Sequence, residues 1–153
     1  LAQLQAQQRG HIIERLVVKP TIGNLLLWRS VYETEGMYYV DAVRVGLPGN
    51  DKVFTGNRVR AFDINRDLPQ LKDQITVYRD IERFELFSGD FLAWHPDRPN
   101  VLGDVRYAML PTSIRPLWGI ELNLDAPHEH VTFHTYRAMP DTERKAFITM
   151  LLN

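Results

Sequence analysis

Three histidines near residue 130 have the residue type and the spacing that suit a metal site. On an extended strand His128, His130 and His134 would share one face, and neutral imidazole is a good zinc ligand. However, His130 and His134 would lie roughly 13 Å apart on a straight strand, too far to share one ion. Histidines in a solvated loop are therefore one interpretation. A self-contained metal-dependent hydrolase, with Asp104 or Glu129 as its acid, is kept as the alternative.

A second candidate cluster combines a carboxylate and an arginine between two apolar runs. Asp104 and Arg106 are two residues apart, so on a strand they share a face. A buried carboxylate needs a partner, and we expect Arg106 to supply it, joined by Arg29 or Glu121. The functional interpretation is that Arg29 and Arg106 clamp an anionic ligand. The sequence therefore predicts a ligand-binding group made of Asn24, Arg29, Asp104 and Arg106.

Composition excludes several other kinds of chemistry. The chain has 153 residues and no cysteine, so disulfides, thiolate metal sites and a cysteine nucleophile are ruled out. Its formal charge is −1, which gives no case for a broad phosphate-binding surface, and we expect no nucleic-acid partner. No GxSxG, HExxH or GxGxxG motif occurs.

The candidate residues must be positioned by a mixture of helices and strands. Apolar spacing predicts a helix over 1–15, a break at 19–24, and a second helix over 68–87 with Asp67 as its N-cap. A third helix opens at Pro140 and Asp141. A hairpin is expected from strands at 25–33 and 37–45 joined by a turn at 34–36. A short edge strand at 52–55 and four more strands are predicted: 91–95, 101–109, 117–124 and 131–136.

This order of elements predicts an α+β fold. Short turns make the strands mostly antiparallel, in one twisted sheet of about five to seven strands with two to three helices packed on one face. The sequence contains no internal repeat and no linker that would divide it, so we expect 1–153 to be a single domain. The sequence also lacks an initiator methionine, and we expect it to be a fragment of a longer protein.

Several blocks of the chain carry a family resemblance. They are PTIGNLLLWRSVY at 20–32, YYVDAVRV at 38–45, VLGDVRYAMLP at 101–111 and PLWGI at 116–120. Together these blocks resemble the C-terminal part of the bacterial membrane-bound metal-dependent hydrolases, also called YdjM-like inner-membrane proteins.

The resemblance implies a soluble C-terminal domain of a multi-pass protein of the bacterial inner membrane. In that family the metal-binding histidines and acids lie in the membrane-embedded N-terminal half. The resemblance therefore implies no cofactor in this fragment, a divalent metal in the full-length protein, and catalytic residues outside this chain. We expect the domain to bind either substrate or the membrane-embedded half of its own chain. A structural or partner-docking domain without ligand is the remaining alternative.

Overall fold

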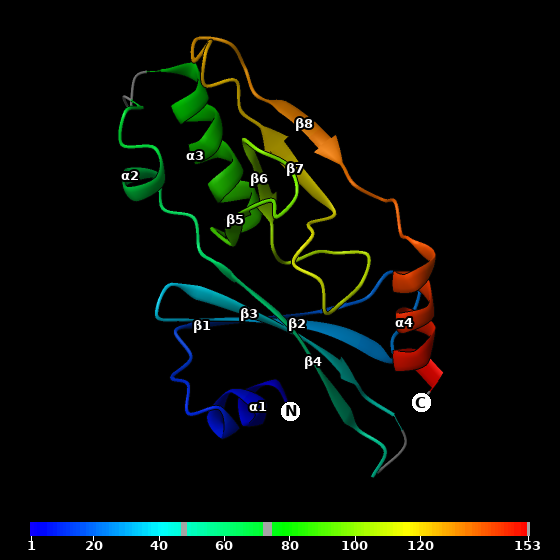
Figure 1. Cartoon of the computed structure of the whole chain (residues 1–153). Helices are drawn as coiled ribbons and strands as arrows, with labels where there is room; N and C mark the ends of the chain where they lie inside the picture. Colours follow the sequence, from blue (N-terminus) through cyan, green and yellow to red (C-terminus); the bar gives the residue numbers. More distant parts are fainter. Residues whose placement is uncertain (47–48, 72–74, 153) are drawn as a thin grey trace.

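The strands form two separate four-stranded antiparallel sheets (Figure 1). The computed structural model describes residues 1–46, 49–71 and 75–152. The first sheet has the order β1-β2-β3-β4, with β1 Arg15–Pro20, β2 Leu27–Thr34, β3 Met37–Arg44 and β4 Lys52–Arg60. The second has the order β5-β6-β7-β8, with β5 Leu92–Trp94, β6 Val101–Asp104, β7 Trp118–Glu121 and β8 Thr132–Thr135. The predicted α+β class is confirmed, with eight strands in two sheets in place of five to seven in one.

The predicted hairpin is confirmed and forms the centre of the first sheet. Its strands β2 and β3 pair from Leu27↔Arg44 to Thr34↔Met37. Glu35 and Gly36, with φ of 50° and 70°, make a two-residue turn whose positive φ angles match the twist of the paired strands. Most residues of both strands are buried, because helix α1 and the second half of the chain cover opposite faces of this sheet (Figure 1).

The prediction for the N-terminal segment is correct only at its start. Helix α1 covers Ala2–Gln8, and Gly10 then takes a positive φ of 74°, which ends the helical path. The residues that follow form β1, whereas the sequence pattern predicts a helix up to residue 15 and a break at 19–24. The β-branched pair Val17 and Val18 gains more from pairing with β2 than from continuing a helix.

The single helix predicted over 68–87 is also wrong. The structure has a short helix α2, Ile64–Asp67, and a longer helix α3, Thr76–Ser88; residues 72–74 of the predicted span lie outside the described part. The predicted N-cap Asp67 is instead the last residue of α2, which is capped by Asp63, since the Asp63 side chain accepts from the Arg66 amide. The predicted end of α3 is confirmed, because Gly89 adopts the left-handed conformation typical of a helix C-terminus.

Two apolar layers hold the second half of the chain together and against the first sheet. Helix α3 packs on the second sheet through Val77, Ile81 and Phe84. Each of the four predicted C-terminal strands contains one observed strand, shorter than expected. A second cluster joins the sheets, with Tyr38 and Val40 of β3 and members from the second half of the chain, which are Phe91, Ala93 and Val105.

The last helix is confirmed as α4, Asp141–Leu152. Its residues Phe147, Met150 and Leu151 pack on Leu27 and Ala42 of the first sheet, so α4 covers the same face as the second sheet (Figure 1). Among the described residues, no helix has both the length and the apolar character needed to cross a bilayer.

Candidate functional site

Arg29 is a residue of β2, and its side chain reaches into the interior toward the segment that follows β6. Its side chain is buried, and its guanidinium donates to the backbone carbonyls of Val105, Pro111 and Ser113 at 2.7–3.0 Å. Burial lowers the pKa of Arg29 to about 9, while the negative charge of Asp104 opposes that shift. Arg29 therefore stays charged at neutral pH and ties the first sheet to the second half of the chain.

The predicted pairing of Asp104 with Arg106 is confirmed, but the third partner differs. Asp104 has no exposed surface; its carboxylate accepts from Arg106 Nε and Nη2 at 3.0 and 2.8 Å, and from the Arg106 amide. The indole of Trp118 supplies the fourth hydrogen bond, at 3.2 Å. Glu121, which we had considered as a partner, instead contacts His134 at 2.7 Å.

Asn24 organises the loop between β1 and β2. Its side-chain oxygen accepts from the amides of Leu26 and Leu27, and its amide nitrogen donates to Thr21 Oγ1. The hydrogen bonds that Asn24, Arg29, Asp104 and Arg106 make in the structure are thus to other groups of the chain. The ligand-binding role assigned to these four residues stays a prediction.

The three histidines near residue 130 do not converge. His130 Nδ1 lies 2.8 Å from Asp80 on α3, whereas His134 Nε2 lies 2.7 Å from Glu121 on β7. His128 lies in the turn before β8. Within the described ranges, no three histidine, aspartate or glutamate side chains are arranged to hold a metal ion. In the described part of the chain, these histidines are therefore not arranged as the metal site that the self-contained hydrolase would need.

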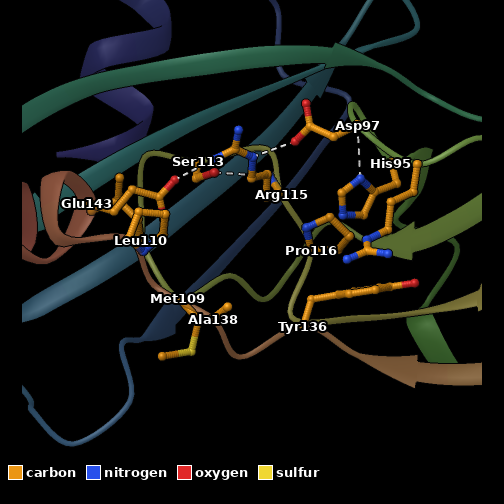
Figure 2. A pocket seen from close by; sticks show the side chains of 12 residues that line it. His95, Asp97, Met109, Leu110, Ser113, Arg115, Pro116, Tyr136, Ala138 and Glu143 are labelled. Atoms are coloured by element: carbon orange, nitrogen blue, oxygen red, sulfur yellow. Dashed lines mark hydrogen bonds and ion pairs between the residues drawn. The ribbon is translucent and has the colours of Figure 1, made fainter.

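A polar pocket opens where the second sheet approaches α4 (Figure 2). It has a volume of about 450 Å³. Polar groups come from the loop after β5 (His95, Asp97), from the chain before β7 (Arg115) and from the segment after β8 (Tyr136). Met109, Leu110, Pro116, Ala138 and Pro140 give the same pocket an apolar part.

His95 is held in one tautomer at this pocket. The backbone amide of Asp97 donates to His95 Nδ1 at 3.1 Å, which places the proton of the neutral ring on Nε2 (Figure 2). Burial lowers the pKa of His95, and the positive charges of Arg98 and Arg115 lower it further while Asp97 opposes them. At neutral pH the ring is therefore uncharged, with Nε2–H as a donor.

The charged residues of the pocket are divided between its two ends. Arg115 bridges Asp97 at 2.6 Å and Glu143 at 2.8 Å, so this arginine ties both carboxylates together (Figure 2). At the other end the guanidinium of Arg98 lies 4.8 Å from the centre of the Tyr136 ring. Burial raises the pKa of Tyr136, so its hydroxyl keeps its proton. This end therefore presents a cation and two neutral donors.

No family model, curated protein or solved structure matches this chain. The geometry of the pocket and the sequence blocks at 20–32 and 101–111 are therefore the features of the chain that bear on its function.

The pocket was missed when only the sequence was considered. Its residues come from segments around 95–98, 109–116 and 136–143, which are separated along the chain. The run from His95 to Pro99 looks like a proline-rich turn, and Arg115 and Glu143 give no local signal. The one local signal of a polar site was the grouping of His95, Asp97 and Arg98 within four residues.

Proposed function

We propose that this chain is a ligand-binding domain and that its pocket holds a small molecule with one anionic group and a short apolar part. The observation that carries this proposal is the donor end of the pocket. There Arg98, His95 and Tyr136 line the same pocket, and the centre of the Tyr136 ring lies 4.8 Å from the Arg98 guanidinium and 5.0 Å from the centre of the His95 ring. A carboxylate or phosphate accepts hydrogen bonds from groups of these kinds.

The charges of the lining limit the ligand further. Arg98 and Arg115 balance Asp97 and Glu143, so the formal charge of the four is zero. A polyanion such as a nucleic acid gains little from such a site, whereas a single anionic group at Arg98 avoids the two carboxylates held by Arg115. The side chains of Met109, Leu110 and other apolar residues suit the uncharged part of the ligand.

We further propose that the domain belongs to a hydrolase of the bacterial inner membrane whose catalytic residues and divalent metal lie outside this chain. The sequence blocks at 20–32 and 101–111 support this placement, since they resemble the C-terminal part of that family. On this proposal the ligand is substrate or product, and the membrane-embedded half of the same protein is the partner. Apolar helices encoded upstream of Leu1 in the full gene are the expected observation, and their absence would remove the placement.

Calorimetric titration tests the pocket directly. We expect benzoate or phenyl phosphate to bind and the neutral analogue benzyl alcohol not to bind, because only the anions engage Arg98. Arg98→Met removes one charge-assisted interaction, worth about 1.5–3 kcal/mol, and should weaken binding by roughly 10- to 100-fold. Arg58→Met, at an exposed arginine on β4, is the matched control and should leave binding unchanged.

Two results would contradict the proposal. One is the absence of any anion binding to the unaltered chain, and the other is equal binding by the Arg98→Met variant. Metal analysis of the purified chain tests the alternative hydrolase built on His128, His130 and His134. Stoichiometric zinc or manganese that is lost when these histidines become alanine would favour that alternative.

A further inference from the structure

The acidic side of the pocket carries one more negative charge than its arginine compensates. The carboxylates of Asp97 and Glu143 contact Arg115 at 2.6 and 2.8 Å. These three residues, the acidic trio, have a formal charge of −1, because one guanidinium lies between two carboxylates. The side chain of Glu143 is only 18% exposed, so water screens its charge poorly. The acidic trio therefore favours one further positive charge in the pocket.

Each carboxylate of the trio also keeps an oxygen that can accept a further hydrogen bond. Arg115 donates to Oδ2 of Asp97 through Nε and to Oε1 of Glu143 through Nη1. In the described part of the chain, the hydrogen bonds to these two side chains leave Oδ1 and Oε2 unused. A primary ammonium has three N–H donors and no acceptor, so it suits such oxygens.

The cationic side of the pocket lies close to the acidic trio. Arg98 follows Asp97 directly in the chain, so their Cα atoms are only about 3.8 Å apart. The two side chains nevertheless have different partners, since the Arg98 guanidinium lies 4.8 Å from the centre of the Tyr136 ring and Asp97 pairs with Arg115. An anionic group at Arg98 and an ammonium group at the acidic trio can thus belong to one small molecule.

Apolar side chains form a third side of the same pocket. Figure 2 shows Met109 and Ala138, the apolar wall, at the bottom of the view, Glu143 at the upper left and Tyr136 at the lower right. A molecule bound here meets a cation, an acidic group and an apolar wall in three different directions. An amino acid with an apolar side chain presents a carboxylate, an ammonium group and an apolar group from one carbon atom. The volume of about 450 Å³ is large enough for a molecule of this size.

We propose that the ligand of this pocket is a zwitterion, namely a free α-amino acid with an apolar side chain. Its carboxylate binds at Arg98, its ammonium group binds the unused oxygens of the acidic trio, and its side chain lies against the apolar wall. Each charge of the ligand then meets one opposite charge of the pocket, which is the complementarity that gives specificity. This inference rests on the proposed ligand-binding function and names the class of ligand.

Three phenyl compounds test the two charges of the ligand separately, by calorimetric titration of the full 153-residue chain. L-Phenylalanine has both charges, 3-phenylpropionate lacks the ammonium group, and 2-phenylethylamine lacks the carboxylate. We expect phenylalanine to bind more tightly than 3-phenylpropionate by roughly tenfold or more, the effect of one charge-assisted hydrogen bond. Binding of 2-phenylethylamine should also be weaker than that of phenylalanine, because this amine leaves Arg98 without an anion.

Two variants test the assignment of the ammonium group to the acidic trio. Glu143→Gln removes the excess negative charge at nearly constant size, and it should bind phenylalanine and 3-phenylpropionate with nearly equal affinity. Asp97→Asn should reduce the same preference and replaces the first variant if that one does not fold. Asp141→Asn is the matched control, since it removes one negative charge from the same helix α4 at a side chain that is 87% exposed. The control should keep the preference, whereas a merely structural effect would weaken both ligands alike.

Three results would overturn the inference and leave the anion pocket in place. They are equal affinities of the unaltered chain for phenylalanine and 3-phenylpropionate, a full preference kept by both Glu143→Gln and Asp97→Asn, and an equal loss of preference in Asp141→Asn. Failure of the unaltered chain to bind any of the anions, 3-phenylpropionate included, would remove the proposed function and this inference with it.

Discussion

Replacing Asp104 by alanine is the sharpest test of how the second half of the chain is held together. The Asp104 carboxylate has no exposed surface and accepts four hydrogen bonds, three from Arg106 and one from Trp118. Alanine removes the acceptor and leaves behind the guanidinium of Arg106, whose side chain is only 18% exposed. The variant thus contains a poorly solvated cation and an indole N–H without its acceptor.

The expected loss is large because the remaining charge is not compensated. Breaking a buried ion pair by removal of one partner costs about 3–5 kcal/mol. A domain of this size is commonly stable by only ~5–15 kcal/mol, so the variant would unfold at a clearly lower urea concentration. Replacing Arg106 by methionine as well removes the guanidinium charge that Asp104 no longer compensates. The double variant should therefore lose at least ~1 kcal/mol less than the sum of the two single losses.

Urea unfolding followed by far-ultraviolet circular dichroism measures these free energies without depending on the fluorescence of Trp118. Asp97→Ala is the matched control, because Asp97 also pairs with an arginine but its side chain is 53% exposed. An exposed pair contributes about 0–1 kcal/mol, and the control should change little. A loss below ~1 kcal/mol for Asp104→Ala, or a loss equal to that of Asp97→Ala, would refute this reasoning.

Two further predictions concern the pocket and the contact between the two halves of the chain. Because burial lowers the pKa of folded His95, the unfolded chain binds a proton more readily, and stability should fall as pH drops below about 6.5. His95→Gln should flatten that part of the stability profile between pH 7 and 5; an unchanged slope would show that another group causes it. Gly56→Ala should cost about 1–3 kcal/mol in urea unfolding, since its Cβ would lie 2.3 Å from the Val40 carbonyl and 2.7 Å from that of Thr112. A neutral Gly56→Ala variant would mean that β4 is free to move away from these backbone groups.

Much of the fold was predictable because its signals are local. The hairpin of β2 and β3 follows from two apolar runs and a turn containing Gly36, and the end of α3 follows from Gly89. The pairing of Asp104 with Arg106 was also predictable, since residues two apart on a strand share a face.

Strand β1 was not predictable in the same way. Its residues follow a stretch rich in alanine, glutamine and leucine, which favours a helix on local propensity alone. Its strand conformation is stabilised by pairing with β2, from Arg15↔Glu33 to Pro20↔Trp28. The division into two sheets likewise depends on which strands pair, and the sequence pattern alone predicted a single sheet.

Local signals in the sequence were thus sufficient to predict the α+β class, the hairpin, the last helix and the ion pair of Asp104. The burial of Arg29 and the pocket lined by His95, Arg98 and Tyr136 are visible only once the chain is folded. The physical reason is the range of the interactions. Turn geometry, periodicity and neighbouring charges act over a few residues, whereas the burial of Arg29 and the assembly of the pocket depend on packing between segments tens of residues apart.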